Sequence, residues 1–552
     1  MKSHFSKITK LGDIKISQLL KTQCMDESNP EFGGFIVEGK GFSEPAWVMF
    51  NASYFLAQYY NASSVYYKNP LVLGRALLAL NYTVSRQYED GTIDLLETNF
   101  HDATAVSFVI QHAAYAYRVV EKFNEGTSEE MIILDTFYNF FEKSAEGIKN
   151  GGFHTPNHRW VVCSALALLM NILNRKDLYS EIILYLREGF DCNEYGEYSE
   201  RSAGVYNEIC NRSLIIMARE LNMPGLYEYV KRNLYMMFQY IEPDMTICTM
   251  NSIRQDSEKV IYPSIYYENY LLMAHLTGNK HFAYMADRLL SMHHDVEWDR
   301  GSFAPRNFPF MALRYMADDF LREEDCECET YDFEHYQQYY DTSHIFRMRQ
   351  GDRSVTVIGE HECFLKFQKG RNYVLLRIAA SYFGPKGKFI PTLEKIQDGY
   401  RLSYECEWGY VRPTGKEKGG LKDGKIVWDV REKVNTMTWV MTVDIFFQDN
   451  GLRLDLSSSG VNRLPVKVDF LFPEGGTLEH GSFAVKGVKG AYTIIKQGEF
   501  EYRYQDDLIY VTGAFGEHEY TTEMRGAPVT DENRFTVNFT GFSPLKKSIW
   551  IK

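Results

Sequence analysis

The sequence predicts two consecutive folds, a ring of helical hairpins (an α/α toroid) followed by an antiparallel β-sandwich. Apolar residues recur at helical spacing up to about residue 325, and they alternate at strand spacing from about residue 330 onward. In the first half, long polar loops also return about every 50 residues. The expected domains are therefore a toroid over residues 1–325 and a sandwich over residues 330–552.

Eleven segments of the first half place apolar residues at helical spacing. These predicted helices span residues 44–61, 69–88, 102–122, 128–147, 158–174, 177–189, 203–221, 225–240, 262–277, 280–294 and 307–321. Long loops rich in Gly, Asn, His and aromatic residues lie between alternate helices, and the intervening turns are short. Antiparallel helix pairs stacked side by side bring every long loop to one face. A closed ring of such pairs has a cleft at that face; an irregular helical domain is the alternative.

After residue 330 the apolar pattern changes to the alternation of β-strands. The predicted strands include residues 354–358, 364–367, 373–378, 402–408, 437–447, 452–456, 466–470 and 535–539. Turns rich in Gly, Asp and Asn separate them, and no helical segment intervenes. Many short strands without helices between them predict an antiparallel sandwich.

The formal net charge of −13 argues against nucleic acid and anionic membrane as main partners, because both select a basic protein surface. No segment is apolar for long enough to span a bilayer, and the N-terminus lacks the apolar stretch of a signal peptide. A cytoplasmic location is expected, or secretion if a signal was removed. The nine cysteines lack framework spacing and indicate reduced thiols. We expect no metal and no cofactor, and the oligomeric state stays open.

Aromatic residues make up 15% of the sequence, with 39 Tyr among them. Tyrosine rings stack on sugars while their hydroxyl groups form hydrogen bonds, so this composition favours a carbohydrate ligand. A large aromatic core explains it equally well.

The sharpest candidate site lies in residues 150–160, Asn-Gly-Gly-Phe-His-Thr-Pro-Asn-His-Arg-Trp. Pro156 ends any preceding helix, so the next helix begins beside it at the predicted cleft. Asn157 then occupies the cap position. It can be explained without any substrate, because Asn is a common N-cap residue. His158 follows in the first helical turn, where the positive end of the helix dipole favours the neutral imidazole that a general base requires. Trp160 begins the same helix and is expected to contact substrate.

A second candidate, Tyr206, follows His158 by 48 residues (206 − 158), which is one repeat of the predicted toroid. The two residues would therefore lie on neighbouring hairpins that face one cleft. Small residues at 202–204 precede Tyr206 and leave room for a ligand. A core tyrosine packed with its apolar neighbours is the alternative.

An Asn-His pair that opens a helix, with a Gly- and Glu-containing loop and a Tyr about 50 residues later, resembles the heparinase II/III and alginate lyase group of polysaccharide lyases. The resemblance implies a toroid and a β-sandwich over nearly the whole chain. It maps the family's Asn, His and Tyr onto Asn157, His158 and Tyr206. The family's sandwich usually begins with a His-x-His cluster, for which this chain has only His361 between two glutamates. The Arg that often precedes the family's Tyr is matched by Arg201.

Such lyases cleave uronic-acid glycans by β-elimination, so the expected substrate is an acidic polysaccharide or oligosaccharide. A neutralised carboxylate makes the C5 proton removable, a base takes this proton, and an acid protonates the oxygen that leaves C4. We expect Asn157, with help from Arg201, Arg212 or Arg254, to neutralise the carboxylate. His158 or Tyr206 is expected to act as base, and Tyr206 as acid. Further expected substrate contacts are Asn99, His101, Trp160, Arg201, Arg212, Arg254 and His361.

Two other functions remain open at this point. A glycoside hydrolase on the same scaffold, such as a glucuronidase or an unsaturated-uronide hydrolase, requires a pair of carboxyl groups roughly 5–10 Å apart. The carboxyl groups available for this pair are those of Asp94, Asp102, Glu197, Glu200 and Glu208. A glycan-binding protein without catalysis would explain the aromatic residues, but not the histidine at a cleft-facing helix start.

Overall fold

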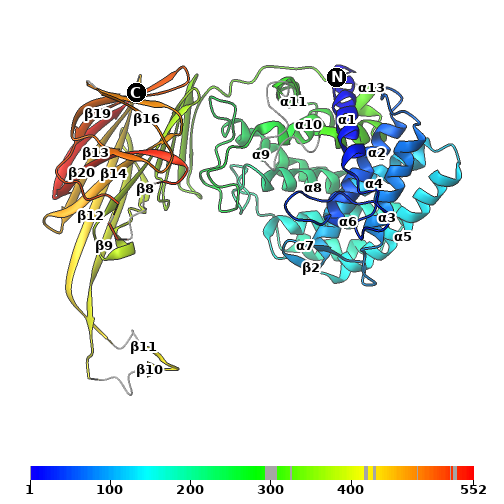
Figure 1. The fold of residues 1–552 in the computed structure, drawn as a ribbon, viewed down its shortest axis with the longest axis horizontal. Helices are drawn as coiled ribbons and strands as arrows, with labels where there is room; N and C mark the ends of the chain where they lie inside the picture. Colours follow the sequence, from blue (N-terminus) through cyan, green and yellow to red (C-terminus); the bar gives the residue numbers. More distant parts are fainter. Residues whose placement is uncertain are drawn as a thin grey trace. The chain divides into compact units, whose positions relative to one another are not determined.

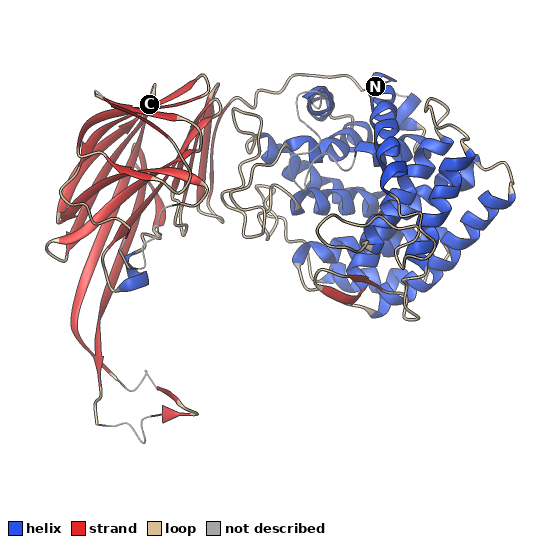
Figure 2. Ribbon diagram, in the orientation of Figure 1, coloured by secondary structure: helices blue, strands red, loops and turns tan. Residues whose placement is uncertain are grey.

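The computed structural model describes residues 2–292, 308–323, 326–415, 421–426, 431–481, 483–522, 524–525 and 531–552. The chain divides into two compact units (Figure 1). The helical unit comprises Met1–Ile241 with Met245–Asp332, and the β unit comprises Glu242–Asp244 with Phe333–Lys552. The described part of the helical unit consists mainly of helices, and that of the β unit consists mainly of antiparallel strands (Figure 2). The predicted fold class is therefore confirmed.

The helical unit contains thirteen α-helices in its described residues. Their bounds are α1 Lys2–Thr22, α2 Pro45–Tyr60, α3 Pro70–Val84, α4 Ala103–Phe123, α5 Ser128–Asn150, α6 Pro156–Ile172, α7 Leu178–Arg187, α8 Tyr206–Glu220, α9 Tyr227–Phe238, α10 Tyr267–Thr277, α11 Lys280–Met292, α12 Phe308–Ala317 and α13 Phe320–Glu323. Short 3₁₀ helices span η1 Pro224–Leu226 and η2 Pro263–Tyr266. One antiparallel hairpin, β1 Ile93–Leu95 with β2 Asn99–Asp102, precedes α4.

The even-numbered helices form an inner ring. Helices α2, α4, α6, α8 and α10 pack successively against one another, and α12 packs against α2 and α4. Helix α6 is buried almost continuously from Trp160 to Leu169, as expected for a helix that has neighbours on every side. The outer helices α3, α5 and α7 cover this ring. No described helix combines the length and apolar character needed to cross a membrane.

Helix α1 was missed by the sequence prediction. Its apolar residues Ile8, Leu11, Ile16 and Leu19 are buried, but lysines between them weaken the helical pattern. The helix packs on α12, and Nδ1 of His4 lies 3.1 Å from the hydroxyl of Tyr267. Long-range packing, which stabilises most helices in proteins, explains α1 better than its local pattern does.

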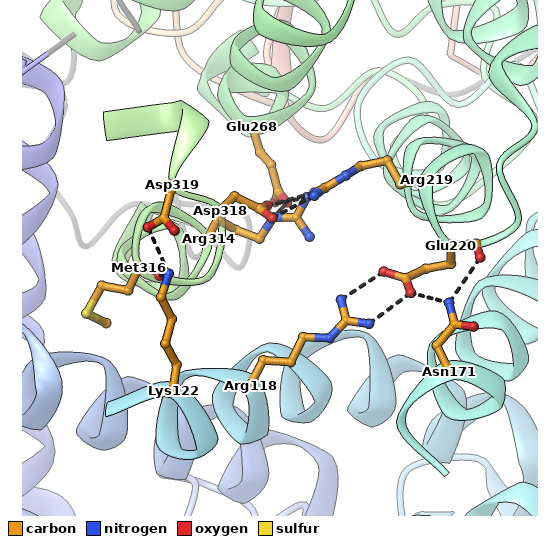
Figure 3. Close-up of polar contacts among 10 residues, drawn as sticks. All are labelled: Arg118, Lys122, Asn171, Arg219, Glu220, Glu268, Arg314, Met316, Asp318 and Asp319. Carbon is orange, nitrogen blue, oxygen red and sulfur yellow. Dashed lines mark hydrogen bonds and ion pairs between the residues drawn. The ribbon is translucent and has the colours of Figure 1, made fainter. Parts of the chain in front are cut away.

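Ion pairs join the C-terminal ends of the inner helices (Figure 3). Arg118 of α4 donates two hydrogen bonds of 2.8 Å to Glu220 of α8. Arg219 donates two of 2.7 Å to Asp318, the residue after α12. Although burial alone would raise it, the guanidinium groups of Arg314 and Arg219 hold the pKa of Asp318 below its ordinary value.

Replacing Arg219 by Met is expected to lower the free energy of unfolding by about 2–4 kcal/mol, because Asp318 then remains buried without its bidentate partner. The folded-state pKa of Asp318 is lowered, so this stabilisation is present above the unfolded pKa of about 4 and is lost as the pH falls through the folded value. Urea denaturation at pH 7 and pH 3 measures the difference. The control is Arg187→Met at an exposed position of α7. Equal losses of stability in both variants would contradict the stabilising role of the Arg219–Asp318 pair.

The β unit consists of two large sheets packed face to face. Its strands are β3 His335–Tyr340, β4 Ile345–Gln350, β5 Arg353–Ile358, β6 Leu365–Lys369, β7 Asn372–Ala380, β8 Thr392–Ile396, β9 Gly399–Arg412, β10 Leu421–Lys422, β11 Lys425–Ile426, β12 Glu432–Gln448, β13 Gly451–Gly460, β14 Leu464–Pro473, β15 Thr477–His480, β16 Phe483–Lys486, β17 Tyr492–Ile494, β18 Gln497–Tyr504, β19 Asp507–Phe515, β20 Arg534–Ser543 and β21 Leu545–Ile551. One sheet has the order β16-β15-β18-β19-β21-β13-β12-β9-β8, and the other has the order β17-β20-β14-β7-β6-β5-β4-β3. Side chains of both sheets, such as Trp439 and Phe470, form one buried core. Of the described pairings, that of β17 with β20 is parallel.

Some sequence expectations differ from the structure or lie outside its described part. Two copies of Gly-Glu-His-Glu, at 359–362 and 516–519, follow strand-like sequence and are expected on strands, but they lie in loops apart from a single bridge at Gly516. The acidic segment 318–329 has the composition of a linker, but helix α13 lies within it. Residues 299–303, expected as a loop, and residues 293–295, expected at a helix end, lie outside the described residues.

Candidate active site

Contacts join four long loops that precede the inner helices. Asn99 before α4 contacts His154 before α6 at 3.1 Å. Glu200 before α8 contacts both α6 and the loop that precedes η2. The long loops of successive hairpins therefore meet, as the repeat spacing predicts.

The carboxylate of Glu200 lies at the N-terminus of α6. Its Oε2 accepts hydrogen bonds from the backbone nitrogen of Asn157 at 3.0 Å and from Nδ2 of the same residue at 2.7 Å. Free N–H groups and the helix dipole make this position favourable for a carboxylate. The other oxygen, Oε1, forms an ion pair with Nε of Arg254 at 3.2 Å. Because Glu200 is only 3% exposed, it fixes Arg254 relative to α6.

Tyr206 is the first residue of α8 and lies beside Arg254. The guanidinium carbon is 5.3 Å from the centre of the Tyr206 ring, within the distance of about 6 Å for a cation–π interaction. The Tyr206 hydroxyl accepts a hydrogen bond from Nε2 of Gln255. Tyr206 is half-buried and Gln255 is exposed, so the phenol stands at the boundary between protein and solvent.

Buried Asp256 holds the two loops around Tyr206 together. Its Oδ1 accepts hydrogen bonds from Oγ of Ser202 at 2.8 Å and from Oγ of Ser252 at 2.6 Å. Its Oδ2 accepts one from the backbone nitrogen of Gly204 at 2.9 Å. A Cβ atom at Gly204 would lie 2.8 Å from this oxygen, so only glycine permits the close approach. Tyr206 is thereby placed next to Arg254.

His158 lies in the first turn of α6 and has the protonation state of a base. Burial, assisted by His154 and Arg254 and opposed by Asp102, lowers the pKa of His158 to about 4. No hydrogen bond joins either of its ring nitrogens to another described residue, and Nδ1 is buried. A structural core histidine would have its nitrogens satisfied. His158 is therefore neutral near pH 7 and has a free lone pair.

A row of polar side chains, His158, His154 and Asn99, leads from α6 to the hairpin before α4, and we call it the polar row. The rings of His158 and His154 lie 4.9 Å apart, and Nε2 of His154 is 3.1 Å from Nδ2 of Asn99. Asn99 also donates to Oδ2 of Asp102 at 2.8 Å. Asp102 caps α4 by accepting hydrogen bonds from two backbone nitrogens. Asn99 thus orients His154, which lies next to His158.

A cavity of about 340 Å³ adjoins Tyr206. Its wall is mainly apolar and comes from α2, β1, α4, α8 and η2, from the residues just before α8, and from Gln255. We call it the apolar cavity. Its lining includes Phe108, whose ring meets that of His158 edge-on at 6.0 Å. The cavity and the polar row are therefore adjacent.

Five of the predicted site residues belong to this connected arrangement. Four of them are His158, Tyr206, Arg254 and Asn99. Asn157 belongs to it too, but its side chain is 0% exposed and donates to Glu200. Asn157 was expected to hold the substrate carboxylate, but its amide donates to the Glu200 carboxylate at the helix terminus instead. The N-cap is Thr155, since Pro156 takes the first helical position.

Trp160 is placed differently from the prediction, whereas a contact of His101 with substrate stays a prediction. Trp160 is 0% exposed, stacks on Phe190 at 4.8 Å and donates from Nε1 to Asp191 at 2.9 Å. This burial contradicts a substrate contact. His101 is exposed but lies 2.7 Å from Asp90 and stacks on the ring of Tyr88 at 3.8 Å, so its ring is already engaged.

The three remaining predicted residues lie in separate places. Arg212 of α8 lines the apolar cavity and pairs with Glu208 at 3.3 Å. Arg201 directly follows Glu200 and has a left-handed backbone with φ of 49°, an uncommon conformation outside glycine that often marks functional loops. His361 lies in the β unit, in the loop between β5 and β6, with Nδ1 near the backbone of Cys363. Its contact with substrate stays a prediction.

Sequence reasoning missed the roles of Glu200, Gln255 and His154. The sequence indicates Glu200 only as a candidate carboxylate for hydrolysis, because its place at the start of α6 depends on a contact with a residue 43 positions away. His154 lies four residues before His158 and was part of the same segment. Gln255 follows Arg254 directly, and no pattern in the sequence distinguishes it.

No family model matches the sequence, and no curated protein matches it. Solved structures do resemble it. A xanthan lyase from Paenibacillus has a TM-score of 0.57 and 10% identity, and the match covers 100% of this chain and 56% of that one. A mutant of a heparan sulfate lyase from Pedobacter heparinus has a TM-score of 0.51 and 10% identity, with coverage of 91% and 76%. A heparinase III has a TM-score of 0.51 and 9% identity, with coverage of 87% and 75%. The chain therefore has the toroid-and-sandwich fold of these polysaccharide lyases.

Proposed function

We propose that this chain is a lyase that cleaves a uronic-acid-containing polysaccharide or oligosaccharide by β-elimination. The observation that supports it most is the adjacency of a half-buried phenol, a guanidinium group and a neutral histidine around Tyr206, Arg254 and His158. These are the three chemical groups that elimination requires. The fold shared with polysaccharide lyases adds support.

Arg254 is the group that neutralises the substrate carboxylate in this proposal. Its Nε faces Glu200, and no hydrogen bond joins its two Nη groups to another described residue. Two parallel N–H groups suit a bidentate carboxylate. Asn157, for which the sequence predicted this contact, instead positions Glu200 and through it Arg254.

His158 and Tyr206 carry the proton transfers. The base removes the proton from C5, the electron pair forms the C4–C5 double bond, and the C4–O bond breaks. The hydroxyl of Tyr206 donates its proton to the leaving oxygen. The neutral imidazole of His158 serves as base; the phenolate of Tyr206 serves instead if proton and leaving group share one face of the sugar. No water is consumed.

Glycoside hydrolysis is the alternative, and one observation favours it. Glu208 lines the apolar cavity, and burial, opposed by Arg212, raises its pKa to about 7. A carboxyl group that stays protonated near neutral pH is the acid that such hydrolases use. Glu200, one candidate for the second carboxylate of the pair, is committed to Asn157 and Arg254.

The test is ultraviolet absorbance during incubation with a panel of uronic-acid glycans. Elimination leaves a double bond conjugated with the carboxylate, so absorbance should rise for at least one glycan without added cofactor. New reducing ends without absorbance would favour hydrolysis. Loss of absorbance from an unsaturated oligosaccharide would indicate an unsaturated-uronide hydrolase.

A further inference from the structure

The apolar cavity has the size and wall of a single-sugar site. Its volume of about 340 Å³ is near the lower end of the range of about 300–1,000 Å³ for ligand pockets. The aromatic rings of Trp47, Phe50 and Phe108 belong to the wall, together with the aliphatic side chains of Val205 and Ile209. Such rings bind the apolar faces and substituents of sugars.

The cation in the cavity wall already has partners. Arg212 is the only cation among its described lining residues; it is 6% exposed and contacts Glu208 and Gln111, each at 3.3 Å. Burial, assisted by Arg212 and Arg314, lowers the pKa of the lining residue His112 to about 3, so this ring is neutral. A sulfate or a second carboxylate would lose its hydration here without gaining a free cation.

The cavity adjoins the reacting groups. Tyr206 and Gln255 line it and also hydrogen-bond to each other. Phe108 lines it and meets the ring of His158. An occupant of the cavity is therefore the immediate neighbour of a uronate held between Arg254 and Tyr206.

We propose that the apolar cavity binds the sugar next to the cleaved uronate, and that this sugar is uncharged and carries a short apolar substituent. The substituent is either the methyl group of a 6-deoxy sugar or an acyl group, since both present an apolar end to the aromatic wall. The inference rests on the proposed function, because it takes Tyr206 as the boundary between this sugar and the reacting uronate.

Calorimetry with the Tyr206→Phe variant measures binding without turnover. Four matched oligosaccharides place next to the uronate an unsubstituted hexose, its 6-deoxy form, its acetyl ester or its sulfate ester. The deoxy or the acetyl form should bind about tenfold or more tightly than the unsubstituted form, as one buried apolar group does in a fitted pocket. The tighter of the two identifies the substituent. The sulfate ester should bind at least about 100-fold more weakly than that form.

A second substitution, made in the same background, links this preference to the cavity. Val205→Phe fills it, and Val65→Phe is the matched control on a residue that is 77% exposed and outside the cavity. The ratio of the affinity for the substituted oligosaccharide to the affinity for the unsubstituted one should fall to nearly one in Val205→Phe. The ratio should be unchanged in Val65→Phe. Trp47→Ala, at a residue 40% exposed, should also reduce it and serves if Val205→Phe does not fold.

Equal binding of the unsubstituted or sulfated form would overturn the inference, as would a preference that survives both cavity variants. Its failure is distinguishable from that of the proposed function. A clear binding preference without any unsaturated product from the unmodified chain contradicts elimination alone. Unsaturated product formed equally well from the sulfated oligosaccharide contradicts the cavity assignment alone.

Discussion

Replacing Tyr206 by Phe is expected to abolish the rise in ultraviolet absorbance. The change removes the phenolic proton and keeps the ring that packs beneath Arg254 at 5.3 Å. Loss of one general acid–base group lowers the rate by about 10²–10⁴-fold. If Tyr206 serves as both base and acid, the loss of rate should be at the upper end of this range. The initial rate of absorbance increase measures the loss.

Tyr179→Phe on α7 is the matched control, because Tyr179 is 44% exposed and lies outside the apolar cavity. It should retain full activity. Circular dichroism and thermal unfolding should match the unmodified chain for both variants. Activity of Tyr206→Phe within tenfold of the unmodified chain would remove Tyr206 from the proton transfers.

Replacing His158 by Ala is expected to lower kcat/KM by about 10²–10⁴-fold if the imidazole is the base. Because burial lowers the pKa of His158 to about 4, the histidine is protonated, and inactive as a base, only below that pH. The acid limb of the kcat/KM profile should therefore lie near pH 4, well below the value of about 6.5 for an ordinary histidine.

His281→Ala is the control for this variant, since His281 contacts Tyr235 on α9 and does not line the apolar cavity. It should leave both the rate and the acid limb unchanged. A rate for His158→Ala close to that of the unmodified chain would assign the base to Tyr206 alone. An acid limb near pH 6.5 would contradict the buried, neutral state of His158.

Helices and strands with a regular apolar period could be predicted from the sequence. The predicted helix 44–61 matches α2 and 102–122 matches α4, because their apolar residues face the packed ring. Helix α1 could not be predicted, because its lysines mask a stripe that only α12 and the neighbouring helices bury. The assignment of residues 242–244 to the β unit also depends on tertiary packing.

Only those features of the candidate site that follow from the repeat spacing or from a residue's own helix could be predicted. The repeat spacing predicted that the loops of His158 and Tyr206 lie close together. The position of His158 at a helix start predicted that its imidazole is neutral. The direction of each side chain was not predictable. Asn157 turns to Glu200, 43 residues away, and Trp160 turns into the core, because inner-ring helices offer apolar contacts on every side.

The measurement that tests elimination most directly is the mass of the products formed in water labelled with oxygen-18. Elimination breaks the C4–O bond without water, so the masses of the two fragments should sum to that of the substrate, and neither fragment should acquire the label during cleavage. Hydrolysis adds one water molecule and places one labelled oxygen in the fragment with the new reducing end. Unlabelled, unsaturated fragments that are absent from Tyr206→Phe are the predicted result. A labelled fragment with the added mass of water would contradict the account and move the search for catalytic residues to Glu208.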